Sequence, residues 1–139
     1  MDPVLYKAAM EGGIEVVEQM ADQFEVQLTP NSNTVLHVAA HFGQTQFVEE
    51  VLKNCSLSLF CSVNIEGETS LHISAREGHA GIVRALIGHG KTLEKDLESG
   101  IGATMEMLRT RNVEGDTALF EAVRNNHPDV VEILTKEES

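Results

Sequence analysis

Tryptophan is absent from the 139 residues, and aromatic side chains make up only 4% of them. The apolar share is nevertheless 42% and the charged share 23%, a balance typical of globular chains. The core must therefore be aliphatic, with many small side chains, which predicts helices that pack closely. A chain of this length suits one domain.

Basic residues and cysteines are also few. Ten lysines and arginines stand against 22 aspartates and glutamates, and the formal net charge is −12. This charge repels phosphate backbones, so the composition argues against nucleic acid as a partner. Cys55 and Cys61 form no disulfide framework and indicate a reducing compartment. Their spacing is not that of zinc ligands, so we predict no metal.

Long apolar runs are missing too. No run of 18 apolar residues occurs, so we expect no direct insertion of this chain into a membrane. The start, Met1-Asp2-Pro3, lacks the basic flank and apolar stretch of a signal peptide. The glycine motifs that bind nucleotides are absent as well, and no cofactor is predicted. These absences predict a soluble, cytoplasmic chain.

A repeated segment is the main feature of the chain. Asn-Thr-Val-Leu-His-Val-Ala-Ala around Leu36 returns in similar form around Leu71 and Leu119, and a fainter copy surrounds Leu5. These leucines are 31, 35 and 48 residues apart along the chain. A period of about 33 residues indicates a stacked array, and the longest step indicates a repeat plus an insertion.

Each position of the repeat has a physical reason. A threonine that can cap a helix precedes three of the leucines, and Asp2-Pro3 has this role in the first copy. The leucine and two mostly small residues three and four positions later form one apolar helical face. A second apolar helix follows. The first helix ends, seven positions after the leucine, at residues suited to a left-handed cap: Gly12, Gly43, Gly78 and Asn126.

A turn followed by two antiparallel helices, with T-x-L-H-x-A-A in the first helix, resembles the ankyrin repeat. The resemblance implies an all-α solenoid of four helix–turn–helix repeats with β-turn or hairpin fingers. We place the repeats at about 2–29, 30–63, 64–90 and 112–139, with an insertion at about 91–111. The chain departs from the family pattern at two positions. The usual proline is replaced by Val35, Ser70 and Ala118, and the usual histidine is replaced by Phe120 in the last repeat.

We predict that the insertion is a flexible, partly ordered segment outside the stacked repeats. The alternative is that it is a partner-binding loop. Residues 92–98 could form one or two helical turns that place Leu93 and Leu97 on one side. Ser99-Gly100-Ile101-Gly102 would then break the helix. Long loops in compact domains are usually functional or disordered, so the two interpretations stay open.

The amino-acid sequence of the repeats also resembles that of plant ankyrin proteins of the accelerated-cell-death type. The similar segments are TPNSNTVLHVAAHFGQ and RNVEGDTALFEAVRNNH. Members of that group carry ankyrin repeats before a membrane-spanning region and take part in defence signalling. The resemblance implies that this chain is an N-terminal cytosolic fragment or a short form, at the cytosolic face of a membrane if its parent is membrane-anchored.

Six histidines invite catalytic or metal interpretations. His37 and His72 occupy the same repeat position, which predicts a structural role. The others, at 41, 79, 89 and 127, are interpreted as belonging to different positions, and they show no metal-ligand spacing. No Cys–His pair has evident nucleophile geometry. The sequence therefore predicts no catalytic residue and no enzyme.

The resemblance implies that a protein partner binds the concave surface, which the finger tips and the ends of the first helices form. Carried over position by position, the predicted partner-binding residues are Met10, Glu11, Asn33, His41, Phe42, Ile65, Glu66, Glu68, Arg76, Glu77, Val113, Glu114, Asp116, Arg124 and Asn125.

Two properties of this predicted surface suggest what it binds. Phe42 and Ile65 are apolar at positions expected to be exposed, so they are either interface anchors or side chains that pack on a neighbouring turn. Six acidic residues outnumber two arginines among the predicted residues, which favours a partner with a basic patch.

The sequence thus favours a non-enzymatic protein-interaction module of four repeats, the cytosolic part of a defence or signalling protein. The alternative is a regulatory domain that gates an attached membrane channel or transport segment absent from this chain. A third interpretation is self-association through the end of the stack.

Overall fold

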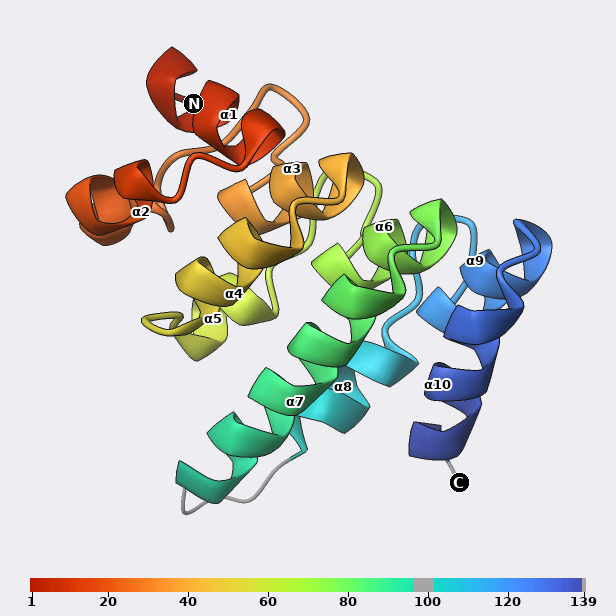
Figure 1. The fold of residues 1–139 in the computed structure, drawn as a ribbon. Helices are drawn as coiled ribbons and strands as arrows, with labels where there is room; N and C mark the ends of the chain where they lie inside the picture. Colours follow the sequence, from red (N-terminus) through yellow and green to blue (C-terminus); the bar gives the residue numbers. More distant parts are fainter. Residues whose placement is uncertain (97–101, 139) are drawn as a thin grey trace.

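The computed structural model describes residues 1–96 and 102–138, whose helices stack in four successive units (Figure 1). The elements of the units follow in chain order. Unit 1 has α1 (Pro3–Glu11), α2 (Glu15–Met20) and the 3-10 helix η1 (Ala21–Gln23); unit 2 has α3 (Val35–Phe42), α4 (Thr45–Leu52) and α5 (Leu57–Phe60); unit 3 has α6 (Ser70–Glu77), α7 (Ala80–Asp96) and α8 (Ala103–Arg109); unit 4 has α9 (Ala118–Arg124) and α10 (Pro128–Glu138).

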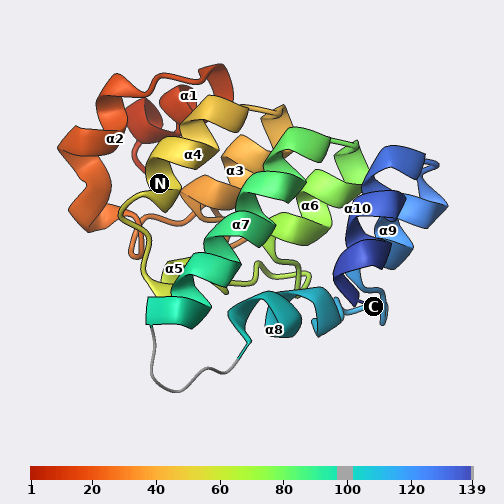
Figure 2. The ribbon, with the colours of Figure 1, turned by 60° about the horizontal axis from the view of Figure 1, so that its bottom comes forward.

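The first helices of the units form one row and the second helices form another (Figure 2). In the first row α1 contacts α3, α3 contacts α6, and α6 contacts α9. In the second row α2 contacts α4, α4 contacts α7, and α7 contacts α10. The predicted all-α solenoid is therefore confirmed.

The core lies between the two rows and is mostly aliphatic. Leu5, Leu36 and Leu71 are fully buried, and burial of a side chain of this size is worth about 1.5–3 kcal/mol. Leu119, the equivalent residue of unit 4, is only partly buried. Leu5 is buried although it belongs to the first unit, so it is the unit that follows in the stack that removes the repeated leucine from water.

The predicted helix starts are confirmed. The Asp2 carboxylate accepts a hydrogen bond from the Val4 amide at 2.8 Å. The hydroxyls of Thr34, Thr69 and Thr117 each accept a bond from the amide three residues later, at 3.3–3.4 Å. Each cap satisfies one of the amides that the first turn of a helix leaves without a partner.

The predicted left-handed cap is found in all four units. Gly12, Gly43 and Gly78 have φ of 84°, 74° and 77°, and Asn126 has φ of 60°. Glycine adopts this conformation without strain, and asparagine is the residue that replaces it most readily. The position seven residues after the leucine therefore ends the first helix even where the glycine is missing.

Short turns, which we call the fingers, precede the first helices of units 2, 3 and 4 at residues 29–33, 64–68 and 112–116. Each closes on itself, as when the Asn64 amide donates to the Glu68 carbonyl at 3.0 Å. Neighbouring fingers are also joined, because the amides of Ile65 and Val113 donate to the carbonyls of Asn31 and Glu66, both at 2.9 Å. The fingers therefore form one connected edge.

Most of the described residues of the segment expected to be a flexible, partly ordered insertion are helical. α7 continues past residue 90 to Asp96, and α8 packs against α7 with Met107 and Leu108 buried. Leu93 is partly buried against the core, as its predicted position in a helix implies. The predictions for Leu97 and for residues 99–101 lie outside the described residues. α8 comes just before a finger, as α5 does in unit 2, so the extra length enlarges an element that a shorter unit also has.

Candidate functional site

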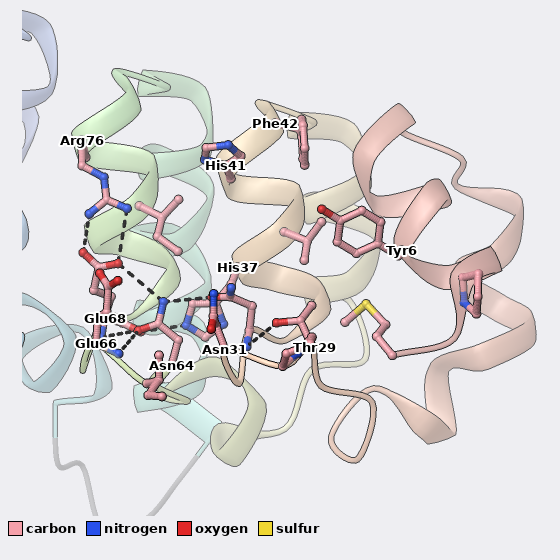
Figure 3. A pocket seen from close by; sticks show the side chains of 17 residues that line it. Tyr6, Thr29, Asn31, His37, His41, Phe42, Asn64, Glu66, Glu68 and Arg76 are labelled. Carbon is pink, nitrogen blue, oxygen red and sulfur yellow. Dashed lines mark hydrogen bonds and ion pairs between the residues drawn. The ribbon is translucent and has the colours of Figure 1, made fainter.

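The fingers and the first helices enclose a hollow of about 660 Å³, which we call the first hollow (Figure 3). Tyr6 of α1 and Phe42 of α3 line one side of it, and Glu68 and Arg76 lie on the other. The tip of finger 64–68 contributes Ile65 and Glu66. Pockets that hold small ligands or side chains have volumes in this range.

The apolar side chains of the first hollow remain accessible. Ile65 is 65% exposed, Phe42 is 40% exposed and Tyr6 is 38% exposed. Phe42 makes an edge contact with the ring of its neighbour His41, with centroids 4.9 Å apart. The predicted exposure of Phe42 and Ile65 is confirmed. Tyr6 was missed, although it follows Leu5 as His37 follows Leu36.

His37 fixes the floor of the first hollow. Its Nδ1 accepts a hydrogen bond from the Thr34 amide at 3.0 Å, and its Nε2 donates to the Glu68 carbonyl of the next finger at 2.7 Å. His72 repeats this arrangement with Thr69 and with the Asp116 carbonyl at 3.0 Å. Burial lowers the pKa of both imidazoles below the ordinary 6.5, so both are neutral at pH 7. The predicted structural role of these histidines is confirmed.

Two of the predicted surface acids are buried instead. Glu68 is only 3% exposed and Asp116 only 7%. The Arg76 guanidinium is bound by the Glu68 carboxylate, and an Arg124 nitrogen lies 2.6 Å from Asp116 Oδ2. Burial alone would raise the pKa of Glu68, but the hydrogen bond and charge of Arg76 outweigh it and lower that pKa. These two acids are therefore paired within the chain and are not exposed as their predicted place on the surface implied.

A second, smaller hollow of about 210 Å³ lies between the fingers of units 3 and 4. Glu121 of α9 lies under it, with its carboxylate 3.9 Å from Arg76 and 4.0 Å from Arg124. The Asn112 side-chain amide also donates to Glu121, at 3.2 Å. Sequence reasoning missed Glu121, although it stands where units 2 and 3 have the apolar residues Val38 and Ile73.

The two hollows contain most of the predicted partner-binding residues, and three of these residues line both. The first is lined by Asn33, His41, Phe42 and Ile65, the second by Val113, Glu114, Arg124 and Asn125, and both by Glu66, Glu68 and Arg76. Four predicted residues line neither hollow: Met10, Glu11, Glu77 and Asp116.

The residue eight positions after the leucine joins each of units 2, 3 and 4 to the previous unit. Gln44 Nε2 donates to the Met10 carbonyl at 2.7 Å, and His79 Nε2 donates to the His41 carbonyl at 3.3 Å. His127 Nε2 donates to the Arg76 carbonyl at 2.8 Å. The interpretation that His79 and His127 belong to different repeat positions is therefore wrong. Counting from the leucines would have revealed their equivalence.

Comparison with known proteins agrees with this geometry. A family model described as ankyrin repeats (3 copies) matches residues 5–99 and 57–139. The chain belongs to the ankyrin repeat family. Ankyrin repeats mediate the binding of protein partners, so these four units form a protein-interaction module. Within the part of the chain that the structure describes, no helix is both long and apolar enough to cross a membrane.

Two curated plant proteins are similar to this ankyrin chain. One is Protein ACCELERATED CELL DEATH 6 of Arabidopsis thaliana, 30% identical over 90 residues, which are 63% of this chain and 13% of that protein. The other is Ankyrin repeat-containing protein ITN1 of Arabidopsis thaliana, 39% identical over 62 residues, which are 45% of this chain and 10% of that protein. The similarity thus spans a small part of either relative.

Proposed function

We propose that this ankyrin chain is a non-enzymatic recognition module that binds a protein partner in the first hollow. The observation that carries the proposal is the accessible apolar group in a concave site, formed by Tyr6, Phe42 and Ile65. Aromatic and large aliphatic side chains surrounded by polar ones are the usual energetic centres of protein interfaces. Residues of three units contribute to the site, so it depends on the stack.

The hollow is rigid enough to bind with little loss of conformational freedom. His37 ties α3 to finger 64–68, and Ile65 ties that finger to finger 29–33 through its amide. Arg76 holds α6 to the same finger through Glu68. A site that is ordered before binding avoids the entropic cost of ordering it in the complex.

The two buried histidines and the two cysteines are engaged in hydrogen bonds or unreactive. Both ring nitrogens of His37 and of His72 make hydrogen bonds. Burial raises the pKa of the Cys55 thiol to about 12 and also raises the pKa of the Cys61 thiol. Thiols with raised pKa values are poor nucleophiles because the thiolate is the reactive form. These features support a binding role over an enzymatic one.

The names of the relatives suggest a biological setting. Protein ACCELERATED CELL DEATH 6 supports a role of this chain in plant defence or signalling. In this proposal the ankyrin units are the cytoplasmic recognition part of a larger protein, which places them at the cytosolic face of a membrane if that protein is membrane-anchored. The net charge of −12 supports a partner with a basic patch.

Quantitative affinity purification tests the binding role. The chain and two double variants are each used to capture proteins from an extract of the cells that produce it. Phe42→Ala/Ile65→Ala removes two apolar side chains of the hollow, and Val26→Ala/Leu57→Ala removes two exposed apolar side chains that do not line it. We expect the first variant to lose specific partners that the second retains. Equal recovery by all three proteins would refute the proposed site.

A further inference from the structure

The boundary between the two hollows carries a free negative charge. Glu66, Glu68 and Arg76 line both hollows. Glu68 and Arg76 are bound to each other, so their charges cancel. Glu66 is exposed, and no cation of the described residues pairs with its carboxylate. The same finger therefore presents an apolar contact at Ile65 and, one residue later, an uncompensated carboxylate.

The second hollow has an excess of negative charge. Glu66, Glu68, Glu114 and Glu121 line it, against Arg76 and Arg124. The guanidinium of Arg124 is shared among three carboxylates, because it lies 2.6 Å from Asp116, 3.4 Å from Glu114 and 4.0 Å from Glu121. Both guanidinium groups are thus occupied by carboxylates of the chain, and neither is free to bind an acidic partner.

The first hollow has a different character. Its exposed large apolar side chains are Tyr6, Phe42 and Ile65, and its one guanidinium, that of Arg76, is occupied by Glu68. Met1 also lines this hollow, and its ammonium group donates to the Leu28 carbonyl at 2.6 Å. An apolar site therefore borders an acidic one, with Ile65 and Glu66 at the boundary.

From this juxtaposition we infer that the partner presents an extended segment with a large apolar side chain and, a few residues away, a lysine or arginine. The apolar side chain enters the first hollow between Phe42, Tyr6 and Ile65. The cation lies over Glu66 and faces Glu114 in the second hollow. An extended segment rises about 3.3 Å per residue, so one short stretch can reach both sites from the shared finger. The inference rests on the proposed binding function and adds the chemistry of the partner.

The segment is tested by selecting random linear peptides displayed on phage against the full chain. The selected peptides are then synthesised with a fluorescent label, and their affinities are measured by anisotropy at low and high salt. We expect the selection to enrich peptides that combine an aromatic or large aliphatic residue with a nearby lysine or arginine. Replacing either residue of a peptide by alanine should weaken its binding.

Variants of the chain separate the two parts of the inference. Phe42→Ala should weaken these peptides about tenfold or more, as the loss of an interface anchor does. Glu66→Lys should weaken them about tenfold and reduce their dependence on salt. Glu49→Lys changes the net charge equally at an exposed position that lines neither hollow and should change affinity less than about twofold.

The other possible results of the peptide selection contradict either the inferred segment, the proposed binding function, or both. Two outcomes would overturn the inference and leave the proposed function standing. In one, the peptides depend on Phe42 but have equal affinities for Glu66→Lys and for the original chain. In the other, the selected peptides are acidic. Selected peptides that neither Phe42→Ala nor Glu66→Lys weakens would overturn both. Failure to enrich any peptide would refute a linear segment as the ligand, and the affinity purification would then decide the proposed function alone.

Discussion

The ring of His127 covers the α-carbon of Gly78, and a β-carbon added there would lie 2.5 Å from His127 Nδ1. The same ring donates from Nε2 to the Arg76 carbonyl at 2.8 Å. His79 covers Gly43 in the same way, one unit earlier. The glycine is thus needed both for its positive φ and for the approach of the next unit. Asn126 has the positive φ of this position, and its side chain is exposed.

Gly78→Ala should lower the free energy of unfolding by about 1–3 kcal/mol, because alanine is strained at a φ of 77° and its β-carbon displaces His127. Asn126→Gly is the matched control and should change stability by less than about 0.5 kcal/mol. Urea denaturation followed by circular dichroism measures both. Equal stabilities of Gly78→Ala and the original chain would contradict the packing of the units.

Gly90 marks the place where α8 lies against α7. A β-carbon there would lie 2.4 Å from Thr104 Oγ1 and 3.3 Å from Phe60 Cζ, whereas one at Gly88 meets nothing within 4 Å. Gly88→Ala should be neutral or stabilising by up to about 1 kcal/mol, since alanine favours helices. Gly90→Ala has the same gain in helix propensity, but its β-carbon would collide with Thr104, so it should be destabilising by about 1–2 kcal/mol. Thermal unfolding compares the two, and a stabilising Gly90→Ala would refute the docking of α8.

The repeated leucine should matter more inside the stack than at its end. Leu71→Ala should cost about 2–5 kcal/mol, as for other fully buried leucines. Leu119→Ala removes the same atoms from a partly buried site and should cost clearly less. Denaturant titration of both variants measures the difference. Equal losses would mean that neighbouring units do not bury the leucines as described.

Stability should fall as the pH falls below about 6.5. The folded-state pKa values of His37 and His72 lie below the ordinary 6.5 because burial disfavours the charged ring. The unfolded chain therefore binds more protons in this window, and protonation favours unfolding. His89, whose pKa burial also lowers, acts in the same direction. Denaturation at pH 7.5 and 5.5 measures the loss.

His72→Gln tests which group causes this loss. The variant should be less stable at pH 7.5, since glutamine cannot reproduce both hydrogen bonds of the ring, but its stability should fall less between pH 7.5 and 5.5. A pH dependence identical to that of the original chain would exclude His72 as a cause. Below about pH 4.5 a further loss is expected from Glu68, because its pKa is lowered in the folded chain.

Local rules that repeat along the chain could be predicted from the sequence. The threonine caps and the left-handed caps depend on residues within one or two turns of helix. These caps and the apolar leucine position each recur in several units. Repetition separates such a rule from coincidence. For the same reason the exposure of Phe42 and Ile65 followed from their repeat positions.

Contacts between a finger and the following helix were harder to predict. Glu68 and Asp116 stand in fingers, where charged residues are usually solvated, and only the arginine eight residues later explains their burial. The spacing is the same in Glu68–Arg76 and Asp116–Arg124, so the signal was present in the sequence. Glu121 gave a weaker signal, since its burial depends on two arginines of different units.

Mapping a bound peptide on the chain tests the central claim most directly. Amide chemical shifts of the isotope-labelled chain are recorded by two-dimensional NMR while a selected peptide is added. The concave binding site predicts that the largest changes fall at finger 29–33, at His41 and Phe42, and at fingers 64–68 and 112–116. Changes confined to the second row of helices, α2, α4, α7 and α10, would contradict it.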